Sequence, residues 1–410
     1  MPEKMDRKTL GNRIAAAWRL LSKHGVRASV REVVRANSVR GLRLPLEEYE
    51  FVSSVPLGKL IRDGDVPRNT ITWVIPPFAA GAGGHTTIFR FVHYLEKRGF
   101  DCRIVILGGI ERGSSDHFRN LIRNSFFPIE AAIYVDPIDA PPAHATIATS
   151  WETAYLVRGI RSTVHRYYFV QDFEPWFYPV GTRYCLAEAT YRFGFNGITA
   201  GTWLSQKLAQ DYGMRTVAFS FSCDKSVYYP VPRERPTRTK VFFYTRPSTE
   251  RRAFELGLLA IGELNTRMQG VEAIFAGSDL SNVRIPFAHR SEGIVAAERL
   301  AQLFNECDVA LVLSLTNLSL LPVEIMACGT PVVSNRGPYV NWLLNETNSF
   351  LAEPTPEELA EALHKALTDE NARERVRVAG MALAASTSWE EQAGRIVDVF
   401  SMVDADRMHC

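Results

Sequence analysis

The chain has 410 residues, of which 46% are hydrophobic and 22% charged, so it is long enough for two domains that each bury a full core. Its formal net charge of +2 is too small to indicate a nucleic-acid-binding protein, and no apolar run reaches the roughly 18 residues of a membrane-spanning helix. The six cysteines are scattered and form no C-x-x-C pair, which argues against a zinc site or a disulfide framework and is typical of a cytoplasmic protein.

Residues 1–65 are predicted to form an N-terminal extension. The chain begins MPEKMDRKTL, without the apolar stretch of a signal peptide. Residues 7–37 combine Arg, Lys and Ala with Leu, Val and Ile, which predicts one or two amphipathic helices. Such helices either contact an anionic membrane surface or pack on the protein's own body. We favour packing, because acidic residues are mixed in and no Trp/Phe-rich face is present.

From Ile71 onward, apolar strands alternate with helices. ITWVIPP is predicted as a buried strand, GAGGH as a tight loop and TTIFRFVHYLEKRG as a helix that ends at Gly99. Further strands are expected at CRIVILGG, AAIYVDP, ATIATS, RYYFVQD and GITAG. This alternation predicts an α/β domain with a doubly wound parallel sheet.

A proline-rich linker, YPVPRERPTRT at Tyr229–Thr239, separates this region from a second alternation. Its strands are expected at KVFFYTRP, VEAIFAG, DVALVLS and TPVVSN, and its helices at residues 252–268, 295–305, 319–327 and 356–368. Thr355 and Glu358 are predicted to form a capping box at the start of the last of these helices. A Trp-containing amphipathic helix, Ser388–Val403, closes the sequence.

The loop Gly81–Gly84 lies between a predicted strand and helix, where a backbone can approach an anionic ligand closely. A dinucleotide fold is the rival interpretation, but Thr86 stands at the third glycine position and the next strand ends in Gly108 and Gly109 without an acidic residue. We therefore exclude NAD binding. A plain tight turn remains the alternative to a ligand-binding loop.

Polar and aromatic residues are densest in YYFVQDFEPWFY, at Tyr167–Tyr178. Asp172 and Glu174 follow an apolar strand, and the carboxyl ends of strands face the ligand crevice of open α/β sheets. Aromatic rings beside carboxylates are suited to sugars, which offer apolar C–H faces and hydroxyl rims. The alternative is that the rings belong to the core and the acids to the solvated surface.

Basic residues occupy the matching place in the second half. Arg246 ends its first strand, and Arg251 and Arg252 follow near the next helix. Guanidinium groups bind phosphate oxygens in a bidentate manner, so this cluster predicts an anion site. A solvated basic turn is the alternative.

The segment SLTNLSLLPVEIMACGTPVVSN, Ser314–Asn335, leads from a strand through a polar loop into a short helix. Ser319 is predicted to cap this helix, with Pro322 in its first turn. The free N–H groups of the helix N-terminus are suited to a diphosphate, and Glu324 is placed to accept hydrogen bonds from ribose hydroxyls. The alternative is that Glu324 only caps the helix and is itself solvated.

These segments together, over about residues 70–402, resemble the large retaining glycosyltransferase family 4, which has the GT-B fold. The family's C-terminal signature, a Pro followed by E-A-M-A-C-G-x-P-V-V, stands here as P-V-E-I-M-A-C-G-T-P-V-V. Its diphosphate pair, an Arg with a Lys five residues on, matches Arg246 and Arg251. One departure is clear: the family's E-x7-E begins with Glu, and here Thr316 takes that position.

The resemblance implies two facing Rossmann-like domains after the extension. The acceptor-side domain is expected at residues 66–236 with a crossover helix at 387–410, and the nucleotide-sugar domain at 237–386. The candidate catalytic residues are Asp172, Arg246 and Arg251. The candidate donor-binding residues are Glu324, Thr316, Ser319, Leu320 and Gly277. The candidate acceptor-side residues are Gly83, Gly84, Gln171, Glu174 and Trp176.

The run V-Q-D-F-E-P-W-F-Y-P also resembles a subgroup of rhamnosyltransferases that build bacterial surface glycans. The expected substrates are therefore dTDP-L-rhamnose and a glycan or lipid-linked glycan, without a further cofactor, in the cytoplasm or at the inner face of the membrane. A GT-B nucleotide-sugar epimerase and a non-catalytic sugar-nucleotide binding protein are the alternatives. The D-x-D triplets at Asp63–Asp65 and Asp404–Asp406 follow no core strand, so metal independence is expected.

Overall fold

The computed structural model describes residues 45–53, 56–79, 81–108, 112–232 and 238–408. The chain divides into two compact units, residues 1–55 and 56–410. In the first unit, the described part is the 3-10 helix η1 (Pro45–Val52). The helices expected within residues 7–37 lie outside the described residues.

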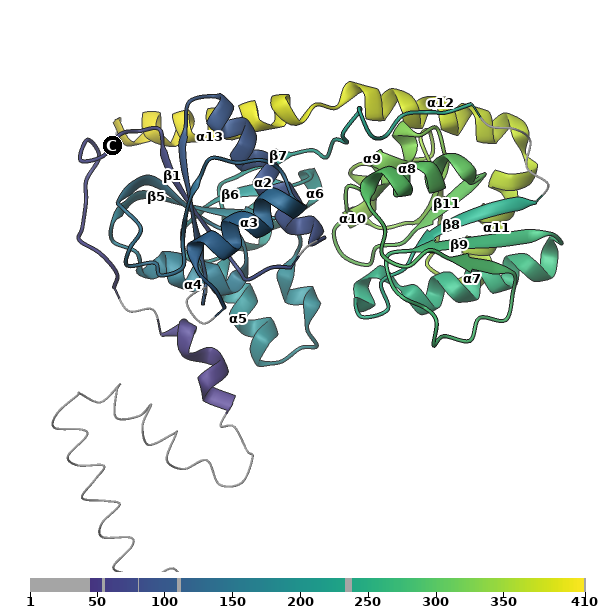
Figure 1. The fold of residues 1–410 in the computed structure, drawn as a ribbon, viewed down its shortest axis with the longest axis horizontal. Coiled ribbons are helices and arrows are strands. Elements are labelled where there is room, and N and C mark those ends of the chain that lie inside the picture. Colours follow the sequence, from purple (N-terminus) through teal and green to yellow (C-terminus); the bar gives the residue numbers. More distant parts are fainter. Residues whose placement is uncertain (1–44, 54–55, 80, 109–111, 233–237, 409–410) are drawn as a thin grey trace, which may run out of the picture. The chain divides into compact units, whose positions relative to one another are not determined.

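The first half of the second unit is built on a seven-stranded sheet in the order β3-β2-β1-β4-β5-β6-β7, in which all pairs are parallel (Figure 1). Its strands are β1 (Thr70–Ile75), β2 (Asp101–Ile106), β3 (Ala132–Tyr134), β4 (Ala143–Ala148), β5 (Thr163–Val170), β6 (Asn196–Ala200) and β7 (Thr216–Phe219). Its helices are α2 (Gly83–Lys97), α3 (Ser115–Ser125), α4 (Trp151–Gly159), α5 (Thr182–Thr190) and α6 (Thr202–Tyr212), with the short 3-10 helix η3 (Glu174–Phe177). Strands β1 and β4 are buried along their whole length because helices cover both faces of the sheet.

The other half is built on a six-stranded parallel sheet in the order β10-β9-β8-β11-β12-β13. Its strands are β8 (Thr239–Tyr244), β9 (Val271–Ala276), β10 (His289–Ser291), β11 (Val309–Val312), β12 (Val332–Asn335) and β13 (Phe350–Ala352). Its helices are η4 (Glu250–Arg252), α7 (Phe254–Arg267), α8 (Ala297–Glu306), α9 (Leu321–Ala327), α10 (Pro338–Asn341), α11 (Pro356–Thr368) and α12 (Glu370–Ser386). The predicted α/β class, with two doubly wound parallel sheets, is confirmed.

The last helix, α13 (Trp389–Met408), runs along the first sheet, whereas α12 packs on α9 of the second (Figure 1). Trp389 is 5% exposed and packs edge-on against Phe91 of α2, with ring centroids 5.7 Å apart. Thr387, between the two helices, donates a hydrogen bond from its hydroxyl to the Ser222 hydroxyl at 2.9 Å. The sequence predicted the closing helix but not α12.

The hydrogen bonds at the N-termini of α11 and α9 test two predicted capping residues. Thr355 caps α11 by accepting from the Glu358 N–H at 3.3 Å, as expected for one half of a capping box. Ser319 does not cap α9. Leu320 already has helical backbone angles and its carbonyl accepts from the Val323 N–H at 3.0 Å, so the helix begins at Leu321.

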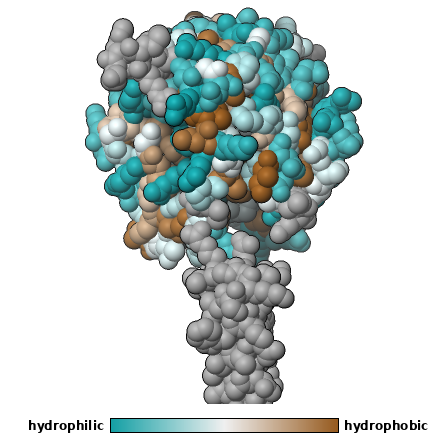
Figure 2. All heavy atoms as spheres, turned by 90° about the vertical axis from the view of Figure 1, so that its left-hand side faces the viewer, coloured by the Kyte–Doolittle hydropathy of each residue, from teal (hydrophilic) through white to brown (hydrophobic). Residues whose placement is uncertain are grey.

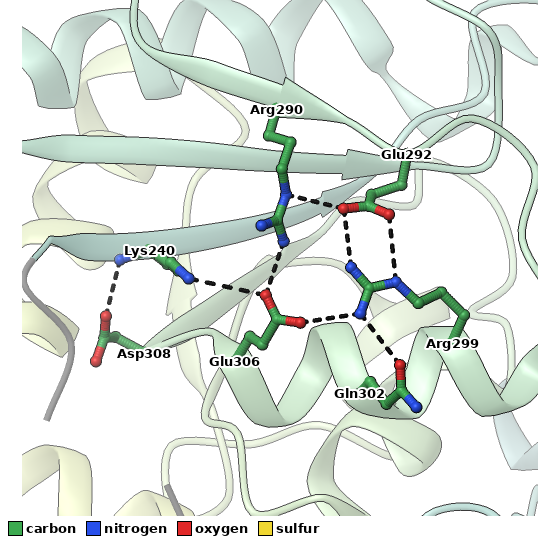
Figure 3. Close-up of polar contacts among 7 residues, drawn as sticks. All are labelled: Lys240, Arg290, Glu292, Arg299, Gln302, Glu306 and Asp308. Atoms are coloured by element: carbon green, nitrogen blue, oxygen red, sulfur yellow. Dashed lines mark hydrogen bonds and ion pairs between the residues drawn. The ribbon is translucent and has the colours of Figure 1, made fainter. Parts of the chain in front are cut away.

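A set of ion pairs ties the edge of the second sheet to α8 (Figure 3). Glu306 lies 2.7 Å from Arg290 and 3.0 Å from Arg299, and Lys240 is 3.7 Å away. Glu292 closes the set by contacting both arginines, at 2.8 and 3.0 Å. We call these five residues the Glu306 network. Its side chains are between 18% and 38% exposed, so water screens it in part.

Apolar side chains occur in separate small groups among polar ones on the face shown in Figure 2. Among the described residues, no helix combines the length and the apolar character that crossing a bilayer requires.

Candidate functional site

Several polar contacts between the two halves of the second unit converge on one carboxylate. Asp172, two residues after β5, is 7% exposed. Its Oδ1 accepts from the Asn317 N–H at 2.7 Å and its Oδ2 from the Thr316 hydroxyl at 2.8 Å. Arg251 Nε lies 3.5 Å from the same Oδ2. We call these four residues the Asp172 node. It brings together predicted residues from both sheets: Asp172, Thr316 and Arg251.

Asn317, one of the four residues of the Asp172 node, was not predicted. Its amide nitrogen donates to the carbonyls of Gln171 at 3.0 Å and Ala200 at 2.7 Å, and its Oδ1 accepts from the Trp342 indole at 3.0 Å. Trp342 packs so closely on Gly201 that a Cβ there would lie 2.5 Å from the ring. The loop after β11 is therefore held against the ends of β5 and β6. A lone Asn gives no sequence signal for such a role.

Three arginines surround this loop. Arg246 stacks on Tyr244, with its guanidinium carbon 5.2 Å from the ring centroid, and Arg251 lies over Phe177 at 4.0 Å. Arg252 donates to the Ser314 hydroxyl at 2.6 Å and the Asn317 carbonyl at 3.1 Å.

Burial lowers the pKa of Arg252 to about 10; Asp172 opposes this effect, and the like charges of Arg251 and Arg246 add to it. At Arg252, the like charges of two further arginines are thus opposed by a single carboxylate. Such a surplus of positive charge is suited to binding an anion with several oxygens, such as a diphosphate.

Gly277 follows β9 beside this cluster. Its φ is +109°, and a Cβ there would approach the Thr245 carbonyl to 2.8 Å and the Tyr244 ring to 2.8 Å. Only glycine fits this backbone position without strain. Gly277, a predicted donor-binding residue, therefore lies against the end of β8, near Arg246.

Glu324 lies apart from the Asp172 node, in the first turn of α9. It accepts a hydrogen bond from the Tyr228 hydroxyl, in the segment that joins the two sheets. Burial raises the pKa of Glu324 to about 7, while the charge of Arg90 and the Tyr228 hydrogen bond oppose the rise and Asp224 adds to it.

Arg90, on α2, was not predicted. It is 7% exposed, and its Nε and Nη1 have no hydrogen-bond partner among the described residues. Its guanidinium lies between the rings of Phe127 and Trp389, at 4.9 and 4.7 Å. A buried arginine in an ordinary helix gives no sequence pattern that separates it from a surface residue.

The predicted acceptor-side residues divide into two groups. Gly83 begins α2, and the Gly84 carbonyl accepts from the Gln171 side chain at 3.1 Å, so the glycine loop lies next to the segment that carries Asp172. Trp176 is 39% exposed.

Glu174 instead points into the first half and is 5% exposed. Its carboxylate accepts from the Trp151 N–H at 2.6 Å and the Tyr168 hydroxyl at 2.9 Å. Burial, reinforced by Glu152, raises its pKa to about 8. Glu174 therefore fixes η3 to the start of α4, and its carboxyl group is buried among these partners.

The D-x-D triplet at Asp63 belongs to a loop turn before β1: Asp63 pairs with Arg68 at 3.2 Å, and Asp65 accepts from the Arg62 N–H at 2.7 Å. The side chains of the triplet at Asp404 lie outside the described residues. Across the part of the chain that the structure describes, no three His, Cys, Asp or Glu side chains gather as a metal site would require.

Two family models match parts of the chain. Residues 239–364 match "WsaF, C-terminal domain", and residues 137–200 match "WsaF, N-terminal domain". The O-antigen biosynthesis protein RfbC of Myxococcus xanthus is 33% identical over 431 residues. That match covers 96% of this chain, but the chain spans only 32% of the relative's length.

Solved structures share the fold at low identity. HepE of Anabaena, solved in complex with UDP and glucose, is 15% identical, with a TM-score of 0.63 over 81% of this chain and 99% of that one. WaaG, a glycosyltransferase involved in lipopolysaccharide biosynthesis, is 12% identical, with a TM-score of 0.61 over 80% and 99%. The chain has the GT-B fold, and the matches support a glycosyltransferase enzyme.

Proposed function

We propose that this chain is a retaining glycosyltransferase that moves L-rhamnose from dTDP-L-rhamnose to a glycan acceptor of a bacterial surface polysaccharide. The observation that carries the proposal is the Asp172 node with three arginines around it, where the ends of both sheets meet. The O-antigen biosynthesis relative supports a role in surface polysaccharides. The resemblance of the run at Asp172 to rhamnosyltransferases supports the donor sugar.

In this proposal, each half supplies a different part of the chemistry. As the sugar–oxygen bond breaks, negative charge grows on the leaving diphosphate, and Arg246 and Arg251 stabilise it. Arg252 is bonded to Ser314 and the Asn317 carbonyl, so it positions the loop under the diphosphate. Glu324, in the first turn of α9, accepts hydrogen bonds from the ribose hydroxyls. Asp172 orients the transferred sugar against the acceptor hydroxyl.

The arginines provide the positive charge that a divalent ion supplies in other glycosyltransferases, so we propose that the reaction needs neither metal nor cofactor. We place it in the cytoplasm, at the inner face of the membrane if the acceptor is lipid-linked.

The test is a transfer assay with dTDP-L-rhamnose and a fluorescently tagged rhamnose trisaccharide, read by mass spectrometry. We expect the trisaccharide to gain one rhamnose and dTDP to be released only when the acceptor is present. Consumption of donor without an acceptor, with a new nucleotide sugar as product, would instead identify an epimerase. Binding of dTDP-L-rhamnose without any turnover would identify a binding protein.

A further inference from the structure

Three large aromatic rings from separate elements meet beside η3. Trp176 of η3 and Trp203 of α6 have ring centroids 5.7 Å apart, with 32° between their planes. Tyr339 of α10 contacts both edge-on, at 6.2 and 5.8 Å. We call these three residues the aromatic platform. No sequence pattern groups these residues, because they lie on three separate helices in the two halves.

The aromatic platform lies at the border of the cores, because Trp203 and Tyr339 pack against core residues. Trp176 keeps 39% of its surface exposed, and Trp203 and Tyr339 are half-buried. Charged groups border it: Lys207 Nζ lies 5.6 Å from the Trp176 ring centroid and 2.7 Å from Asp211. Solvent-exposed rings beside hydrogen-bonding groups offer both kinds of contact that a sugar needs, an apolar face for its C–H groups and a polar rim for its hydroxyls.

The position of the platform relative to the Asp172 node is fixed by short-range structure. The Trp176 N–H donates to the Phe173 carbonyl at 3.0 Å, and the two rings pack at 5.0 Å. Buried Glu174 holds the same turn to α4. Trp176 is thus set rigidly four residues after Asp172, as expected for a binding surface next to a reacting centre.

We propose that the aromatic platform binds a sugar residue of the acceptor glycan by stacking against its C–H face, beyond the residue that reacts. This inference rests on the proposed function in one respect, namely that the acceptor is a glycan. Three rings with an ion pair at their border offer both the apolar and the polar contacts of a sugar-binding surface. Because Tyr339 comes from the second sheet and the tryptophans from the first, acceptor binding favours the same arrangement of the two halves as the Asp172 node.

Calorimetric titration of the full chain with a rhamnose trisaccharide, and separately with maltotriose, tests the platform. We expect Trp203→Leu to weaken binding of the preferred saccharide at least about tenfold, which is about 1.4 kcal/mol. Trp203→Phe retains a flat ring and should keep most of the affinity. Leu259→Ala, at a 59% exposed apolar residue of α7, is the matched control and should bind like the wild type.

An unchanged affinity in Trp203→Leu, or a wild type that binds neither saccharide, overturns the proposal. So does a parallel loss of dTDP affinity and melting temperature in Trp203→Leu, since the rings would then only join the two halves. The transfer assay separates this inference from the proposed function. Saccharide binding that depends on Trp203 in a chain without rhamnose transfer keeps the platform and rejects the reaction. Rhamnose transfer that is unchanged in Trp203→Leu keeps the proposed reaction and rejects the platform.

Discussion

The Asp172 node and the Glu306 network are both centred on one carboxylate among arginines, but they differ in burial and in span. Asp172 is 7% exposed and contacts residues 144 and 145 positions further along the chain. Glu306 is about one-third exposed, and its arginines lie within 16 residues of it on the same sheet layer. In the network two carboxylates face three basic side chains. At Arg252, by contrast, the charges of Arg251 and Arg246 are opposed by Asp172 alone. A ligand is therefore expected at the buried cluster between the two sheets, where one carboxylate opposes several arginines, and not at the larger, more exposed set of ion pairs.

The largest effect is expected from Asp172→Asn. The substitution keeps the shape but removes the charge that orients the transferred sugar, so turnover should fall by about 10²–10³. Affinity for dTDP should change little, because the residue comes from the first sheet. Steady-state kinetics with calorimetry of dTDP binding measures both.

Asp308→Asn is the matched control, since Asp308 also accepts from a backbone N–H, that of Lys240 at 2.8 Å, but lies at the Glu306 network. It should leave turnover unchanged. Equal losses of dTDP affinity and turnover in Asp172→Asn would place Asp172 in the donor site instead.

Arg246→Ala should remove most of the activity. The lost charge-assisted hydrogen bonds to the diphosphate are worth about 1.5–3 kcal/mol each, which corresponds to a rate loss of about 10- to 100-fold. Excess EDTA should leave the wild-type rate nearly unchanged, because the arginines supply the positive charge.

Arg290→Ala removes an arginine from the Glu306 network and should leave the rate near that of the wild type. Activity that vanishes in EDTA and returns with magnesium or manganese contradicts this account of the leaving group.

The sequence predicts the two sheets and the strand ends that carry Asp172 and Arg246, but it does not predict the contact between Asp172 and Thr316. Strand periodicity from Ile71 onward indicates two parallel sheets, and parallel strands place Asp172 and Arg246 at carboxyl ends. The pairing of Asp172 with Thr316 depends on how two separately folded sheets face each other, which no local pattern records. Glu174 looks like Asp172 in sequence, yet it turns inward because Trp151 and Tyr168 offer it donors. Ser319 has the chemistry of a cap, but the backbone starts the helix one residue after Leu320.

A smaller, pH-dependent effect is expected at Glu324. The carboxylate must be ionised to accept strongly from ribose hydroxyls, and its pKa is raised to about 7, so donor affinity should fall as the pH drops through that value. Glu324→Ala should weaken donor binding at least about tenfold at about pH 8, and Glu324→Gln should lose the pH dependence.

Arg90→Met removes the charge that lowers the pKa of Glu324 and should move the fall in affinity to higher pH. Calorimetric dTDP titrations between about pH 6 and about pH 8 measure these changes. An identical pH profile in Glu324→Gln and wild type would exclude Glu324 as the titrating group.

The smallest effect on activity is expected from Glu306→Gln, which tests the Glu306 network. Burial alone would raise the pKa of Glu306, but hydrogen bonds and charges from Arg290 and Arg299 outweigh it and lower the pKa. A lowered pKa means that the network stabilises the fold above the ordinary glutamate range and that this contribution is lost as the pH falls through the folded-state pKa. At neutral pH, Glu306→Gln should cost about 1 kcal/mol and lower the melting temperature by about 2–4 °C, since partly exposed ion pairs are screened by water. The difference should shrink on acidification and in high salt, because both remove the charge interaction that the variant lacks. Differential scanning calorimetry at several pH values measures this, with turnover assayed in parallel. A loss of turnover as large as that of Arg246→Ala would show that the Glu306 network takes part in the site, and the distinction between the two clusters would fail.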